Sequence, residues 1–148
     1  MDQYILTKQG LGYLITHNEC IRLPDNTTIY TAEAFAIFRA IKYAIDNRKN
    51  ITVFTDSLSC LIAIKHHQTE HSIITRILNM LHYTSLTINL CWIPSHCNVL
   101  GNEQADRIAK RSLNLDTDTI QEINIPRKEF MKLYKKQIHN QWQGSMIC

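Results

Sequence analysis

Apolar residues between positions 31 and 92 alternate between helical spacing and short β-branched runs. In residues 31–46, Ala34, Phe38, Ile41 and Ile45 recur at helical spacing, whereas residues 51–55 form a β-branched run typical of a buried strand. The whole stretch predicts a helix, a strand, two helices and a strand, at residues 31–46, 51–55, 57–66, 73–83 and 86–92. Such alternation favours an α/β fold with parallel strands.

Three shorter extended runs precede this region, at residues 4–7, 13–16 and 20–23. Turn residues separate them, which predicts an antiparallel hairpin at the amino-terminal side of the sheet. The expected architecture is therefore a mixed sheet, with antiparallel amino-terminal strands followed by parallel strands. We also expect Tyr83 and Trp92 to lie in the core.

The length of 148 residues suits one domain, and the net charge of +3 permits a polyanionic partner without requiring one. No apolar run approaches the ~20 residues of a membrane-spanning helix, so we expect no membrane partner. The five cysteines are odd in number and lack C-x-x-C spacing, which favours a reduced, intracellular setting in the cytoplasm or nucleus.

Three carboxylates stand at predicted element ends: Glu33 in the first helical turn, Asp56 after the strand at 51–55, and Asp106 in a helix start. In open α/β sheets, ligands bind beyond the carboxyl ends of the strands. Carboxylates gathered there repel one another unless cations offset them, and Mg²⁺ prefers oxygen ligands. His96, on the loop before Asp106, could assist proton transfer or product release.

Each of these residues also has a purely structural interpretation. Glu33 would favour the helix dipole, and Asp56 would be the N-cap of the following helix. Asp106 would pair with Lys110 four residues later, and His96 would be a solvated loop residue. Only the combination favours a catalytic site.

The segment 92–110 resembles type 1 ribonuclease H domains, especially those of non-LTR retrotransposon reverse transcriptase polyproteins. It contains Trp-Ile-Pro-Ser-His at 92–96, and Gly-Asn-Glu-Gln-Ala-Asp at 101–106. Residues 31–33 resemble the family's helix glutamate motif, and residues 54–57 its strand-end aspartate motif. The likeness extends over residues 10–112.

This resemblance implies a five-stranded ribonuclease H-like sheet with helices on both faces. It also implies hydrolysis of the RNA strand of RNA–DNA hybrids by a two-metal-ion mechanism. Glu33, Asp56 and Asp106 would bind Mg²⁺, with Mn²⁺ as an alternative, and His96 would help turnover. The partner would be the hybrid, in a parent polyprotein that carries a reverse transcriptase domain.

One departure from the family concerns the first strand, which in the family ends in Asp-Gly-Ser and supplies a fourth carboxylate. This chain has no Asp-Gly-Ser. Asp2 lies near the expected distance before Gly10; alternatively, residues 3–7 form the strand, with Thr7 or Lys8 at the ligand position. Two rival hypotheses follow: a catalytically impaired nucleic-acid-binding module, and a remnant that folds only beside a polymerase domain.

The sequence divides into a ribonuclease H-like domain at 1–112, a linker at 113–125 and an amphipathic helical tail at 126–148. One tail face is aromatic and apolar, and the opposite face is basic. The basic face either contacts the phosphates of a nucleic acid or is the solvated side of a packed helix. The aromatic face docks either on the domain or on a neighbour, and the oligomeric state is open.

Overall fold

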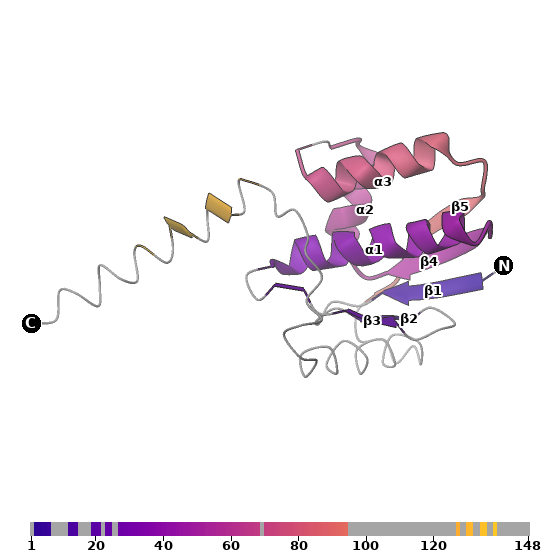
Figure 1. Cartoon of the computed structure of the whole chain (residues 1–148), viewed down its shortest axis with the longest axis horizontal. Helices are drawn as coiled ribbons and strands as arrows, with labels where there is room; N and C mark the ends of the chain where they lie inside the picture. Colours follow the sequence, from indigo (N-terminus) through magenta and orange to yellow (C-terminus); the bar gives the residue numbers. More distant parts are fainter. Residues whose placement is uncertain are drawn as a thin grey trace, which may run out of the picture.

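A computed structural model describes residues 2–6, 12–14, 19–21, 23–24, 27–68 and 70–94, with positions 127, 130, 131, 134, 135 and 138. The elements follow in the order β1 (Asp2–Leu6), β2 (Gly12–Leu14), β3 (Glu19–Cys20), α1 (Ile29–Asp46), β4 (Ile51–Thr55), α2 (Leu58–Lys65), α3 (Ser72–Tyr83) and β5 (Ile88–Trp92) (Figure 1). The predicted linker and the segment 95–112 lie outside the described residues. Within the described part of the chain, no helix is long and apolar enough to cross a membrane.

The five strands form one sheet in the order β3-β2-β1-β4-β5. β1 pairs antiparallel with β2, and β2 pairs antiparallel with β3. β4 is parallel to β1 on one side and to β5 on the other. The sheet is therefore mixed, as predicted, and β4 has a parallel neighbour on each side. A strand in that position is expected to be apolar, which explains the Ile-Thr-Val-Phe-Thr sequence of β4.

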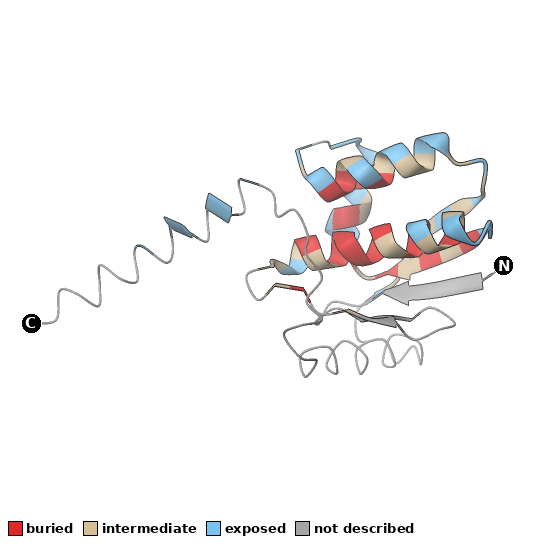
Figure 2. Ribbon diagram, viewed as in Figure 1, coloured by how far each residue is buried: buried red, intermediate tan, exposed pale blue. Residues whose placement is uncertain are grey.

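Helix α1 packs against the sheet, and α3 packs on α1 and α2. Figure 1 shows α1, α2 and α3 on one side of the sheet, so the prediction of helices on both faces is not tested by the described helices. Buried residues of α1, coloured red in Figure 2, face this packing. The largest fully buried apolar side chains come from α1, β4 and α3: Ile37, Ile41, Ile51, Val53, Ile74 and Ile77.

Helix α1 begins at Ile29 rather than at residue 31, because Thr28 is its N-cap. The Thr28 hydroxyl accepts a hydrogen bond from the Thr31 backbone N–H at 3.3 Å. Threonine in this position satisfies an amide that has no partner within the helix. The predicted start was therefore two residues late, which changes the position of Glu33 within the helix.

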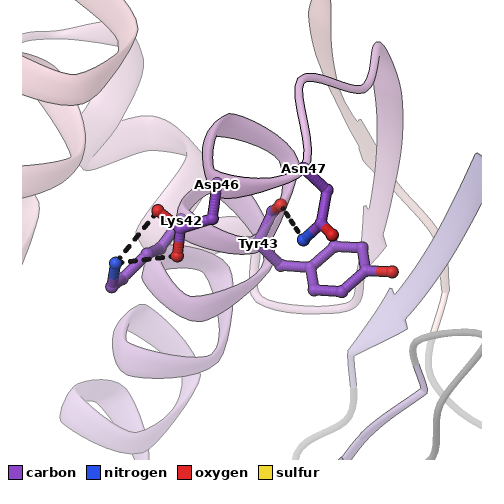
Figure 3. A network of polar contacts seen from close by, with 4 residues as sticks. All are labelled: Lys42, Tyr43, Asp46 and Asn47. Carbon is purple, nitrogen blue, oxygen red and sulfur yellow. Dashed lines mark hydrogen bonds and ion pairs between the residues drawn. The ribbon is translucent and has the colours of Figure 1, made fainter.

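The carboxyl end of α1 is held by local polar contacts (Figure 3). Lys42 forms an ion pair with Asp46 at 2.8 Å, and the Asn47 side-chain amide donates to the Tyr43 carbonyl at 2.8 Å. Arg48 then has a positive φ of 52°, and the next amide, that of Lys49, donates to the Ala44 carbonyl at 2.9 Å. This pattern is a Schellman motif, which usually has glycine where Arg48 stands.

Helix α2 ends in the same way, which explains the predicted interruption after it. His67 has a φ of 52°, and its N–H donates to the Ile64 carbonyl at 3.1 Å. The Gln68 amide donates to the Ala63 carbonyl at 2.9 Å. The left-handed residue turns the chain out of α2 and toward α3.

The prediction that Tyr83 and Trp92 belong to the core was wrong. Tyr83, the last residue of α3, is 82% exposed, and Trp92, the last residue of β5, is 50% exposed. β5 lies at the edge of the described sheet. An aromatic side chain at the end of an edge strand has fewer neighbours to cover it than one on a central strand. Ile88 and Leu90, earlier in β5, do pack against the core.

Candidate functional site

Asp56 follows β4 directly, at the edge of the sheet where three parallel strands end. In the register, Leu6 of β1 pairs with Thr55, and Thr55 pairs with Trp92 of β5. The carboxyl ends of β1, β4 and β5 therefore lie side by side at Asp56. This is the position at which open α/β sheets bind ligands. The structure thus places Asp56 where the sequence predicted it.

Glu33 reaches the same edge from α1. Its carboxylate Oε2 accepts a hydrogen bond from the hydroxyl of Ser57, the residue directly after Asp56. Glu33 is only 7% exposed, and a carboxylate buried to this extent is rare in proteins. The bond joins residues 24 positions apart and brings the first two predicted carboxylates to one end of the sheet.

The structural interpretation of Glu33 as a helix-dipole residue was wrong, because α1 has no acidic residue in its first turn. Glu33 is the fifth residue of α1, and its side chain points into the protein and toward Ser57. Its burial therefore has to be explained by the groups around it rather than by the helix end.

Asp56 is not the N-cap of α2, contrary to the alternative interpretation. The N-cap is Ser57, and the Ser57 side chain makes no capping bond. Its hydroxyl donates to Glu33 instead, while its backbone N–H donates to the Thr55 hydroxyl at 3.1 Å. Ser57 is thus held from the β4 side and in turn holds Glu33. This role of Ser57 was not predicted from the sequence; the available signal was a small hydroxyl residue directly after a strand-end aspartate.

Cys60 lies one helical turn beyond Ser57 and forms the apolar side of this cluster. Its thiol is fully buried and lies 3.7 Å from the Tyr30 carbonyl of α1. Burial raises the pKa of Cys60 to about 12; the negative charge of Glu33 acts in the same direction, whereas a hydrogen bond with Ser57 opposes it. Cys60 is therefore a neutral packing residue, as expected for a structural thiol.

A second polar contact anchors the start of α1 to the start of α3. The hydroxyl of Thr31, which is fully buried, lies 3.0 Å from Nε2 of His71. The His71 ring also meets the Tyr30 ring edge to face, with 5.1 Å between ring centroids. This contact joins residues 40 positions apart and holds the turn of α1 that precedes Glu33.

The chemistry of the donor set fits a hard divalent cation. Glu33 and Asp56 contribute carboxylate oxygens, which Mg²⁺ and Mn²⁺ prefer, and the neighbouring Ser57 and Thr55 side chains also carry oxygen. Among the described residues there is no group of three or more histidine, cysteine, aspartate or glutamate side chains suited to a metal. The third predicted carboxylate, Asp106, lies outside the described residues.

His96 also lies outside the described residues, but the chain leading to it leaves the sheet at the site. The Ile93 N–H donates to the Thr55 carbonyl at 2.9 Å, so the backbone after β5 is still held beside the end of β4. Pro94 is the last described residue of this segment. The chain that continues to His96 therefore leaves β5 at the same edge of the sheet as Asp56.

The register separates Asp2 from this edge. Asp2 is the first residue of β1 and pairs with Ile51, whereas Leu6 pairs with Thr55. The backbone of Asp2 is thus four strand positions from the end of β1 at which Asp56 lies, or about 13 Å at ~3.3 Å per residue. Of the two alternatives for the first strand, the structure agrees with a strand that ends next to Thr7.

Two comparisons with known proteins relate this arrangement to a family. A family model for RNase H matches residues 5–114, which include Glu33, Asp56, His96 and Asp106. The solved structure of a foamy viral protease-reverse transcriptase in complex with dsDNA matches with a TM-score of 0.61 and 18% sequence identity, covering 75% of this chain and 92% of that chain. The second match shows a shared fold. The chain therefore belongs to the RNase H family, and this membership supports a ribonuclease H-type hydrolase.

Proposed function

We propose that the chain hydrolyses the RNA strand of RNA–DNA hybrids at the edge of the sheet formed by the ends of β1, β4 and β5. The observation that carries this proposal is the buried Glu33 carboxylate, which Ser57 holds beside Asp56. Acidic groups buried at a strand-end site are characteristic of catalytic centres. Membership of the RNase H family supports the same activity and the same nucleic-acid partner.

Glu33 and Asp56 would hold Mg²⁺ or Mn²⁺ together with Asp106. When bound there, a pair of divalent ions supplies stabilisation of the attacking and leaving oxygens in an in-line phosphodiester hydrolysis. Ser57 keeps the Glu33 carboxylate oriented through the hydrogen bond that its hydroxyl donates. His96, which follows the end of β5 in the sequence, transfers a proton or assists product release.

The substrate would be recognised by the shape of the hybrid and the 2′-hydroxyls of its RNA strand, as double-stranded RNA-containing helices generally are. We also propose that the chain is a type 1 ribonuclease H domain from a non-LTR retroelement polyprotein. In that polyprotein a reverse transcriptase domain would accompany it. The fold shared with a protease-reverse transcriptase supports the reverse transcriptase context.

The test is cleavage of a hybrid labelled on its RNA strand, with Mg²⁺ or with EDTA. Asp56→Asn keeps the size of the side chain but removes its charge, and it should abolish Mg²⁺-dependent cleavage without changing the circular dichroism spectrum. Asp46→Asn is the matched control, because it makes the same change at an exposed position at the end of α1, where Asp46 forms an ion pair with Lys42. Cleavage by Asp56→Asn at the wild-type rate would refute the proposed site.

A second candidate, a nucleic-acid-binding module without catalysis, is favoured by the β1 register. The β1 residue paired with Thr55 is Leu6, and Asp2 lies at the opposite end of the strand, so the described part of β1 places no carboxylate beside Asp56. This candidate predicts salt-dependent hybrid binding with no Mg²⁺-dependent loss of RNA. Titration of the hybrid in EDTA, followed by addition of Mg²⁺, separates the two functions.

A further inference from the structure

The chain's positive charge is concentrated after residue 126, beyond the end of the RNase H family match at residue 114. Of the 16 lysine and arginine residues, five lie at positions 127–136, and only one of the 13 acidic residues, Glu129, lies after residue 126. Residues 1–126 therefore carry 11 basic and 12 acidic side chains, a net charge of −1. Residues 127–148 carry a net charge of +4, so the net positive charge of the chain, +3, lies entirely in the tail.

The described tail residues are helical and present aromatic rings together with cations. Phe130 and Tyr134 are four positions apart, and their ring planes are nearly parallel, at 9° with 6.3 Å between centroids. Each of the two side chains is 51% exposed. Arg127 and Lys135, which flank the pair in sequence, are also exposed.

This exposure argues against the tail being the packed amphipathic helix that the sequence also allowed. In a packed helix, the aromatic side chains are buried and only the basic face meets solvent. Here the exposed set includes both kinds of residue: Arg127, Phe130, Met131, Tyr134, Lys135 and Ile138. The aromatic rings and the cations are therefore available to the same partner.

We propose that the described tail residues Arg127, Phe130, Tyr134 and Lys135 belong to a binding site for single-stranded nucleic acid, separate from the catalytic edge of the sheet. Proteins that bind single strands without sequence preference combine two features. Cations contact the phosphates, and unpaired bases stack on aromatic side chains. Residues 1–126, with a net charge of −1, supply no comparable net attraction for a polyanion. The tail thus holds the unpaired RNA or DNA that adjoins a hybrid.

The test measures binding of the full chain to a fluorescein-labelled single-stranded RNA, by anisotropy, in EDTA so that no cleavage occurs. Stacking contributes about 1–3 kcal/mol per base, so Phe130→Ala/Tyr134→Ala should weaken binding by about tenfold or more. Arg127→Ala/Lys135→Ala should reduce the slope of log affinity against log salt concentration by about 1.4, at ~0.7 per phosphate contact. A matching unlabelled DNA strand should compete.

The charge control is Lys42→Ala/Lys65→Ala, which removes two exposed cations from α1 and α2 and should leave the affinity within about twofold, as expected for charges away from the contacted phosphates. Unchanged binding by Phe130→Ala/Tyr134→Ala would overturn the proposal. It would also be overturned if sedimentation showed a dimer of the free chain that these substitutions dissociate, because the rings would then join two copies. Both readouts are independent of cleavage, so failure here and failure of the proposed nuclease are distinguishable.

Discussion

Replacing Ser57 with alanine removes the hydroxyl that donates to the buried carboxylate of Glu33. Ser57 is 3% exposed, so water has little access to take the place of the lost hydroxyl. A hydrogen bond to a charged group contributes about 1.5–3 kcal/mol, and leaving its buried acceptor without that donor costs a similar amount. We therefore expect Ser57→Ala to lower the free energy of unfolding by about 1.5–3 kcal/mol. At about 2–4 °C per kcal/mol for a chain of this size, Tm should fall by roughly 3–12 °C.

The assay is urea unfolding followed by circular dichroism, with free energies from linear extrapolation. Ser59→Ala is the matched control, because Ser59 is exposed on the same helix and its hydroxyl lies 3.4 Å from that of Ser57. Its effect should stay within about 0.5 kcal/mol, as for most surface substitutions. Ser57→Thr keeps a hydroxyl and should recover part of the loss.

A double-mutant cycle tests the physical reason rather than the size of the effect. In a Glu33→Ala background the acceptor is absent, so adding Ser57→Ala should cost less than about 0.5 kcal/mol, and the coupling energy should exceed about 1 kcal/mol. An equal cost of Ser57→Ala in both backgrounds would refute the reasoning, because the effect would then come from α2 alone. Because Ser57 positions Glu33, we also expect the Mg²⁺ concentration for half-maximal cleavage to rise in Ser57→Ala but not in Ser59→Ala.

Two further predictions concern backbone strain and a buried thiol. Arg48→Gly should raise the free energy of unfolding by about 0.5–1 kcal/mol in the same assay, because only a residue with Cβ is penalised at its φ of 52°; Arg48→Ala keeps Cβ and should give no gain. The folded-state pKa of Cys60 is raised from 9.0 to about 12. The contribution of the buried thiol to the free energy of unfolding is therefore complete below pH 9 and is lost as pH rises from 9 to 12. Stability of wild type relative to Cys60→Ala should therefore fall across that window, and iodoacetamide should modify Cys60 only after unfolding.

The elements with strong local patterns were predicted closely. The strand at 51–55 has the predicted bounds, and the helices predicted at 57–66 and 73–83 agree with α2 and α3 to within one residue at each end. The three amino-terminal strands, predicted at 4–7, 13–16 and 20–23, are displaced by one to three residues. Such short runs have no periodicity to define their ends, so pairing with β4 and with one another decides where they begin and stop.

The candidate site was predicted only in part, because some of its contacts join residues that are far apart in the sequence. Glu33 and Asp56 were found from their order and spacing, and the structure brings them to one end of the sheet through Ser57. Ser57 itself was missed, because its role depends on a residue 24 positions away. The bounds of the linker and tail, and the positions of His96 and Asp106 relative to the site, stay predictions.

The sequence alone determined the α/β alternation, the apolar faces of the helices and the motifs that identify the RNase H family, because each of these depends on residues that are neighbours along the chain. Only the tertiary structure decided that Glu33 is buried against Ser57, that Asp2 lies at the far end of β1, and that Trp92 is half exposed. Burial and register depend on which elements pack together, and local pattern carries little information about contacts between residues far apart in the chain.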